Sequence, residues 1–221
     1  QADEDAYNAS GQKCSAQSIL FVHENWEKDL IPKLVTLASK RKLENLDIGP
    51  VLTWSNSQIK DHLDSLLKIK GSKLLFGGKE LNDHSIPTNY GSIQPTAVQV
   101  PIKELLTTNF ELITKEVFGP FQVIVSFSDK EINQMKKVLE KITQNLTAAI
   151  VSDDTFFQQD ILANTVNGTT YTGMKARTTG APQNHWFGPS GDPRSAGIGT
   201  PEAIINTWSA HREIIKDTGP Q

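Results

Sequence analysis

The chain has 221 residues, a net charge of −3 and 37% hydrophobic residues, a composition typical of a soluble globular protein. Its Lys and Arg residues are dispersed and no apolar run approaches the ~20 residues that cross a bilayer, so we expect neither nucleic acid nor membrane among its partners. The single cysteine excludes an internal disulfide and indicates a reducing compartment.

Strands and helices alternate along the first half of the chain. Residues 17–23 contain the β-branched and aromatic side chains that favour a strand. Residues 25–40 and 55–68 carry apolar side chains at spacings of three and four, which predicts two amphipathic helices. Residues 72–76 are predicted to form a further strand that ends in a turn at Gly77 and Gly78.

The second half continues this alternation. Strands are predicted at residues 95–100, 122–127, 148–151 and 166–171, and the strand at 148–151 is expected to be buried. Helices are predicted at residues 130–142, 155–164 and 201–209. This order predicts an α/β domain with a largely parallel sheet flanked by helices.

The last fifty residues change in character. Gly, Pro, Asn and Arg dominate residues 173–199, and a loop of that length inside a compact domain is usually functional. Residues 211–216 are predicted to form a short final strand that could pair with another chain.

Cys14 is the first candidate for chemistry. It lies in Gly11-Gln12-Lys13-Cys14-Ser15, between a glycine turn and a predicted strand, where a thiolate could attack an electrophilic carbon. The alternative is a buried cysteine that serves only as a small apolar side chain, which is the commoner case. A cysteine hydrolase would also need a histidine base, for which His185 is the candidate that we retain.

Glu116 is the second candidate, because it precedes Phe118, Gly119 and Pro120 in a predicted loop. Its carboxylate could accept two hydrogen bonds from a diol such as a ribose, whereas the alternative is an ordinary exposed acidic residue. The sequence has no ligand spacing typical of zinc or calcium sites, so we expect no metal. It also has no Gly-x-Gly-x-x-Gly after a strand and no P-loop.

Taken in this order, the segments resemble the aldehyde dehydrogenase superfamily. The matching segments are Gly11-Gln12-Lys13-Cys14, residues 71–78 with Tyr90 and Pro95-Thr96, Glu116-Val117-Phe118-Gly119-Pro120, residues 145–149, and Val166-Asn167-Gly168. Within the superfamily, residues 11–17 and 179–201 are similar to the plant-type Δ1-pyrroline-5-carboxylate dehydrogenases, also called glutamate-semialdehyde dehydrogenases.

The resemblance implies an NAD-dependent enzyme that oxidises L-glutamate γ-semialdehyde to L-glutamate in proline breakdown. It assigns Cys14 as the nucleophile that forms a thiohemiacetal and then a thioester, with its own backbone N–H helping to hold the oxyanion. It assigns Glu116 to the ribose hydroxyls of the nicotinamide and Phe118 to packing near that ring. The expected partner is therefore a small-molecule aldehyde, and the expected cofactor is NAD.

The resemblance also assigns residues to the substrate carboxylate. Ser15 would contact it, and the backbone of Gly199 and Thr200 would add N–H donors. Phe187-Gly188-Pro189 replaces the usual Phe-Gly-Gly of the family, so Ala196-Gly197 is the alternative for these donors. The family is typically mitochondrial, which implies the mitochondrial matrix, and a homo-oligomer is expected for the full-length protein.

A domain organisation follows from the same resemblance. Residues 1–209 correspond to the catalytic domain, and residues 210–221 correspond to the oligomerisation strand and tail. In the superfamily the cofactor domain and the general base precede the cysteine motif, so we expect this chain alone to be nearly inactive. The alternative is a non-catalytic, truncated fragment that acts as a structural or oligomerisation module.

Overall fold

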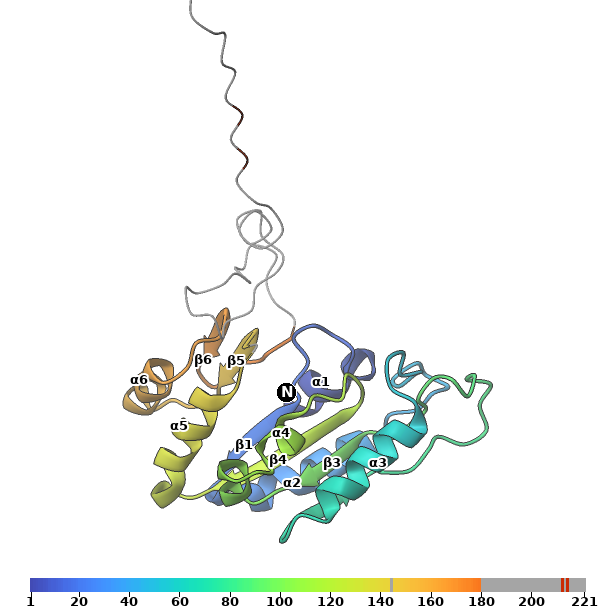
Figure 1. Ribbon diagram of the computed structural model, residues 1–221, viewed down its shortest axis with the longest axis horizontal. Helices are drawn as coiled ribbons and strands as arrows, with labels where there is room; N and C mark the ends of the chain where they lie inside the picture. The colour runs from blue at the N-terminus through green and yellow to red at the C-terminus, as the bar shows by residue number, and fades with distance from the viewer. Residues whose placement is uncertain (144, 180–211, 213, 215–221) are drawn as a thin grey trace, which may run out of the picture.

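A four-stranded sheet lies at the centre of the fold (Figure 1). The computed structural model describes residues 1–143, 145–179, 212 and 214. The strand order is β1-β4-β3-β2, with bounds of Ile19–His23 for β1, Phe121–Phe127 for β4, Thr96–Gln99 for β3 and Lys73–Phe76 for β2. Strand β4 pairs in parallel with β1 and β3, and β2 pairs antiparallel at the edge. The predicted α/β fold with a largely parallel sheet is therefore confirmed.

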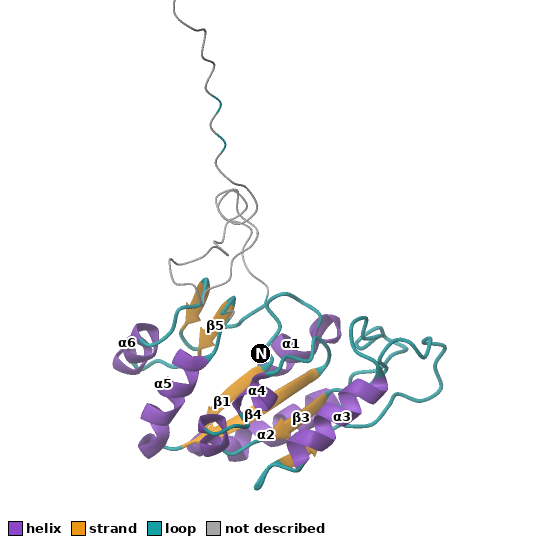
Figure 2. Ribbon diagram, viewed as in Figure 1, coloured by secondary structure: helices purple, strands orange, loops and turns teal. Residues whose placement is uncertain are grey.

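Helices cover both faces of this sheet, so the fold has three layers (Figure 2). One face packs against α3 (Asn56–Leu67), α4 (Phe110–Thr114) and α5 (Ile132–Lys141). The other face packs against α1 (Ala2–Tyr7) and α2 (Glu24–Ala38). Short 3-10 segments connect these elements: η1 (Asn8–Gly11), η2 (Ile102–Leu106) and η3 (Asp129–Glu131).

The alternation of side chains along β4 determines which residues face which layer. Val123, Val125 and Phe127 point into the core shared with α3, α4 and α5. Ile124 points into the core shared with α2, and Gln122 reaches Tyr7 of α1. This is the period of two that a strand imposes, and both faces are apolar because both are covered.

A second, two-stranded sheet follows the first along the chain. Strands β5 (Thr147–Ile150) and β6 (Thr169–Thr172) pair in parallel, and helix α6 (Thr155–Ala163) connects them along the chain. The prediction of a buried strand at residues 148–151 is wrong in part, because Ile150 is buried whereas Ala148 and Ala149 are half-buried, and Val151 follows β5 and is exposed. In a two-stranded sheet each strand has a neighbour on one side only, so its residues are less buried than those of a central strand. Ile150 and Ile161 nevertheless belong to the main core.

Short polar motifs start the helices where the sequence patterns predict them. Ser55 and Gln58 form a capping box at the start of α3, and Ser128 and Glu131 form another before α5. The Asp154 carboxylate accepts hydrogen bonds from the second and third backbone N–H groups of α6. Each cap satisfies helix N–H groups that have no partner within the helix.

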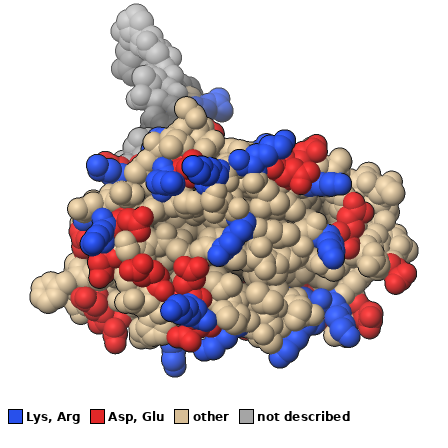
Figure 3. Space-filling view, turned by 90° about the horizontal axis from the view of Figure 1, so that it is seen from below, with Lys and Arg blue, Asp and Glu red and all other residues tan. Residues whose placement is uncertain are grey.

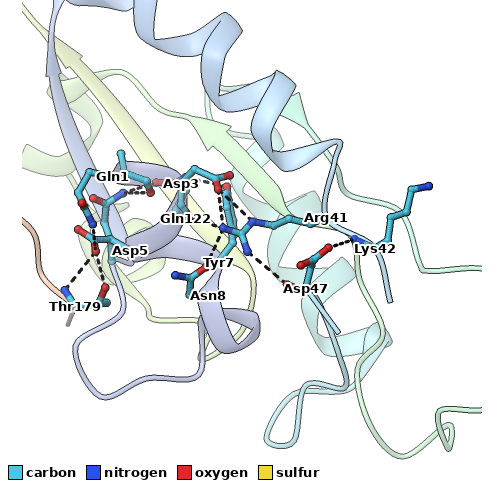
Figure 4. Close-up of polar contacts among 12 residues, drawn as sticks. Gln1, Asp3, Asp5, Tyr7, Asn8, Arg41, Lys42, Asp47, Gln122 and Thr179 are labelled. Atoms are coloured by element: carbon cyan, nitrogen blue, oxygen red, sulfur yellow. Dashed lines mark hydrogen bonds and ion pairs between the residues drawn. The ribbon is translucent and has the colours of Figure 1, made fainter. Parts of the chain in front are cut away.

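Helix α1 was not predicted, because its acidic sequence has the composition of an exposed tail. Asp3 and Asp5 are nevertheless buried and paired (Figure 4). The Asp3 carboxylate accepts hydrogen bonds from Arg41, at 2.6 Å from Nη2 and 3.2 Å from Nε. The partner lies 38 residues away along the chain, so no local pattern predicts the pair.

The Arg41–Asp3 ion pair should be essential for stability. Its side chains are only 12% and 6% exposed, and an R41M substitution leaves the Asp3 carboxylate buried without its counter-ion. We expect the free energy of unfolding, measured with urea, to fall by about 3 kcal/mol.

The matched control is K136M, which breaks the pair between Lys136 and Asp160 at 3.0 Å, where the Asp160 side chain is 43% exposed. That loss should stay below about 1 kcal/mol. Equal losses for R41M and K136M would contradict the proposed importance of the buried pair.

Candidate active site

The turn that carries Cys14 starts in a conformation that most residues avoid. Ala9 and Ser10 have φ values of 54° and 56°, and Gly11 follows with 67°. A left-handed conformation costs roughly 1–2 kcal/mol for a residue with a side chain, so distant contacts must hold this turn. One of them is the hydroxyl of Ser10, which accepts a hydrogen bond from the Gly49 backbone N–H at 2.7 Å.

Gly11 brings the Cys14 turn against the loop that contains Glu116 and Phe118. A Cβ atom at position 11 would collide with the carbonyl oxygen of Gly119, and it would lie 2.9 Å from the carbonyl oxygen of Ala6. The two backbones are therefore in direct contact at a position where only glycine fits. Two motifs separated by about one hundred residues are therefore in contact.

A third segment fixes the turn from the other side. The Gln12 side chain donates a hydrogen bond to the Pro50 carbonyl at 2.9 Å and accepts one from the Leu52 backbone N–H at 2.9 Å. Val51, between these two residues, is buried and contacts Gly119. The Cys14 turn, residues 49–52 and the Gly119 backbone therefore pack on one another.

The thiol of Cys14 is free and exposed. The alternative of a buried, purely structural cysteine is therefore wrong. Ser15 beside it is buried, and a hydrogen bond of 3.0 Å from the Ala16 N–H to the Lys13 carbonyl closes a tight turn around the two residues. An exposed thiol on a turn fixed at its base is accessible to a small electrophile.

The Glu116 loop combines an accessible carboxylate with buried anchors. Glu116 is exposed, but the protein on one side of it partly desolvates the carboxyl group and raises its pKa. Phe118 is half-buried, while Val117 and Phe121 belong to the main core. The loop therefore presents a carboxylate and an aromatic ring from a rigid base.

A cluster of tilted aromatic rings lies next to this loop. The Lys115 ammonium is 5.1 Å from the ring centroid of Trp54, and the buried ring of His62 lies between Trp54 and Phe121 at centroid distances of 6.0 Å and 5.6 Å. Burial, and to a smaller degree the Lys115 charge, lowers the pKa of His62 to about 4. His62 is therefore a neutral aromatic support at physiological pH.

Other predicted residues fall outside this picture. Gly199, Thr200, the alternative pair Ala196-Gly197 and the reserve base His185 lie outside the described residues, as does the final strand except Arg212 and Ile214. Strand β2 ends at Phe76, directly before Gly77 and Gly78 as predicted, and both glycines have a φ of 77°.

The sequence patterns missed the contacts that hold the turn in place. The buried Asp5 carboxylate accepts hydrogen bonds from the Thr178 and Thr179 N–H groups at 2.9 and 3.3 Å, and from the Thr179 hydroxyl at 2.6 Å. These partners lie more than 170 residues away along the chain, so nothing local could have revealed them.

The remaining surface offers few other sites. Among the described residues, no group of three or more His, Cys, Asp and Glu side chains is placed to hold a metal ion, and no described helix is both long enough and apolar enough to span a bilayer. On the face shown in Figure 3, basic and acidic side chains are interspersed. That distribution differs from the continuous basic surface of a phosphate-binding face.

Comparison with known proteins agrees with this geometry. The profile of the aldehyde dehydrogenase family matches residues 2–196. The chain is 60% identical over 223 residues to Delta-1-pyrroline-5-carboxylate dehydrogenase 12A1, mitochondrial, of Arabidopsis thaliana, and covers 40% of that protein. It is also 60% identical over 220 residues to a probable aldehyde dehydrogenase of Linum usitatissimum, again covering 40%.

A solved structure with a similar fold is the salicylaldehyde dehydrogenase of Pseudomonas putida G7 in complex with salicylaldehyde. The TM-score is 0.69 at 16% identity, over 100% of this chain and 43% of that one. At this identity the likeness concerns the fold.

The contact between Gly11 and Gly119 can be tested by adding one methyl group. G11A must adopt a positive φ and must also separate the two backbones, so we expect the free energy of unfolding to fall by more than about 2 kcal/mol. Urea unfolding measures this loss.

G173A is the matched control, because Gly173 has a φ of 102° but nothing within 4 Å of an added Cβ. Its loss should be about 1 kcal/mol, from backbone strain alone. If both variants lost the same amount, the close contact at Gly11 would be excluded as a constraint.

Burial of neutral His62 should make stability depend on pH. The unfolded chain binds a proton at the ordinary histidine pKa of 6.5, whereas the folded site has a pKa of about 4. The stability of the wild type relative to H62F should therefore be constant above pH 7 and fall by about 2 kcal/mol as the pH drops from 6.5 towards 4. Urea unfolding of both proteins at pH 7.5 and pH 4.5 measures it, and a pH-independent difference would refute it.

Proposed function

Because this chain belongs to the aldehyde dehydrogenase family, we propose that the protein containing it oxidises L-glutamate γ-semialdehyde to L-glutamate with NAD. The semialdehyde is the open form of Δ1-pyrroline-5-carboxylate, and the reaction belongs to proline breakdown. The observation that carries the chemistry is the exposed Cys14 thiol on a turn that packs through Gly11 against the Glu116 loop. The identity of 60% to the Arabidopsis enzyme supports the choice of substrate.

Cys14 supplies covalent catalysis in this proposal. Its thiolate forms a bond to the aldehyde carbon, and the carbonyl oxygen becomes an oxyanion that accepts a hydrogen bond from the Cys14 backbone N–H. NAD, which Glu116 and Phe118 would hold, would supply the hydride acceptor, and loss of a hydride from that carbon would leave a thioester on Cys14. Water then attacks the thioester, the carbon–sulfur bond breaks, and glutamate and the free thiol are released.

The residues of the Glu116 loop suit the nicotinamide half of NAD. The exposed Glu116 carboxylate can accept hydrogen bonds from both hydroxyls of a ribose, and partial burial beside it strengthens such bonds. Phe118 offers a half-buried ring for packing near the nicotinamide. The loop cannot shift easily, because Val117 and Phe121 anchor it in the core.

The substrate carboxylate is assigned to Ser15, Gly199 and Thr200. The buried position of Ser15 directly after Cys14 supports a role in orienting a substrate that is attached to the thiol. Hydrogen bonds from a hydroxyl and two backbone N–H groups would distinguish an aldehyde that carries a carboxylate from one that does not.

The chain spans about 40% of the length of the Arabidopsis and Linum relatives. The activity is therefore proposed for the whole protein. We also propose that the whole protein acts in the mitochondrial matrix as a homo-oligomer, without nucleic-acid or membrane partners. In this proposal residues 1–209 form the catalytic domain, and residues 210–221 form the oligomerisation strand and tail. Exposure of Cys14 favours the enzyme over a structural module.

NADH formation from Δ1-pyrroline-5-carboxylate tests the proposal in the full-length protein. C14A should lower kcat by at least ~10³-fold, because it removes the thiol on which the proposed thioester forms. E116Q should raise KM for NAD by about tenfold, since a neutral amide accepts weaker hydrogen bonds than a carboxylate, while KM for the aldehyde stays within about twofold.

S15A separates the substrate assignment from the chemistry. It should raise KM for the semialdehyde about tenfold but leave KM for propanal, which has no carboxylate, unchanged. A wild-type protein that oxidises propanal but not the semialdehyde would overturn the substrate choice. Full activity of C14A would overturn the mechanism.

A further inference from the structure

A buried amide lies where the two motifs of the site meet. Gln122 is 0% exposed and sits in β4, directly after the loop of residues 116–120. Its Nε2 donates a hydrogen bond to the hydroxyl of Tyr7 at 2.8 Å, and its Oε1 accepts one from Nε2 of Gln17 at 2.7 Å. Figure 4 shows Gln122 beside Tyr7.

The two partners of Gln122 are the two ends of the Cys14 turn. Tyr7 is the last residue of α1, and only Asn8 separates it from the left-handed residues 9–11. Gln17 comes three residues after Cys14, and its backbone N–H donates to the Asp5 carbonyl at 2.9 Å. A single side chain therefore joins the start of the turn, the end of the turn and the strand that follows the Glu116 loop.

The direction of each hydrogen bond is fixed. Burial raises the pKa of Tyr7 far above its ordinary value, so the hydroxyl keeps its proton and donates it to the Thr96 carbonyl at 3.0 Å. The hydroxyl oxygen is then left to accept from the amide NH₂ of Gln122, and the amide oxygen is left to accept from Gln17. These three hydrogen bonds, Tyr7 to Thr96, Gln122 to Tyr7 and Gln17 to Gln122, are therefore compatible with only one assignment of donors and acceptors.

An apolar residue would be a simpler choice for stability at this position. The next three residues of β4, Val123, Ile124 and Val125, are buried and apolar, and an amide in the interior is favourable only when its hydrogen bonds are made. Two hydrogen bonds of defined length fix the distances between three segments, which apolar contacts do far less well.

We propose that Gln122 is a positioning residue for Cys14: it holds both ends of the nucleophile turn in a fixed place relative to the Glu116 loop. This inference rests on the proposed function for its kinetic consequence. Gln122 itself is buried and acts through Tyr7 and Gln17.

The kinetic test compares two identical substitutions in the full-length protein. Q122M keeps the volume of the side chain and removes both hydrogen bonds. The control is Q99M, because Gln99 on the neighbouring strand β3 bonds to Glu27 and Ser126 at 3.0 and 2.6 Å, and neither lies in the turn or the Glu116 loop. We expect kcat for the semialdehyde to fall about tenfold in Q122M and to stay within about twofold of the wild type in Q99M.

A second readout does not depend on turnover. The rate at which iodoacetamide alkylates Cys14, followed by mass spectrometry, should change at least about threefold in Q122M, towards the rate of the urea-unfolded protein, and should be unchanged in Q99M. Y7F removes only the Gln122–Tyr7 and Tyr7–Thr96 bonds and should change both readouts in the same direction. If Q122M does not fold, the same two measurements on Y7F test the proposal.

The outcomes separate the two proposals. If Q122M and Q99M lose similar thermal stability while kcat and alkylation of Q122M match the wild type, Gln122 is structural only and the inference is wrong. If the wild type does not oxidise the semialdehyde but alkylation of Cys14 changes in Q122M and Y7F, the proposed function fails and the positioning role stands.

Discussion

The close contact between the backbones of Gly11 and Gly119 is the constraint on which the rest of the site depends. Cys14 and Glu116 belong to the two segments that meet at this contact, so the contact limits how far the two segments can move relative to each other. A side chain at position 11 would separate them, because its Cβ atom would collide with the Gly119 carbonyl and a packed interior leaves no room for an additional methyl group without a shift of the backbone.

Strain in one place is compensated by contacts in another. Ala9 and Ser10 hold left-handed conformations that are unfavourable for both residues, and the partners that stabilise the turn come from far along the chain. Ser10 binds Gly49, and α1 before the turn is fixed by the Asp3–Arg41 pair and by Asp5. Strained backbone persists only where surrounding contacts determine it fully.

The two halves of the site rest on supports of different chemistry. Buried polar groups hold the Cys14 turn, with Gln122 joining its ends. The Glu116 loop instead rests on apolar and aromatic contacts, through Val117, Phe121 and the tilted ring of His62. Hydrogen bonds fix distance and direction, which would suit the nucleophile proposed at Cys14. Ring packing supplies a rigid platform, which would suit the nicotinamide-binding role proposed for this loop.

The local sequence predicts where most helices and strands lie, because side-chain periodicity and caps such as Ser55 and Asp154 act over a few residues. It also identified Cys14 and Glu116 as candidates, because glycine turns around them are visible locally. The tertiary structure alone decided that Cys14 is exposed, that α1 is a buried helix, and that Gln122 joins the turn. Those outcomes depend on partners such as Arg41, Thr179 and Gly119, and contacts between segments so far apart in the chain have no signature in the local sequence.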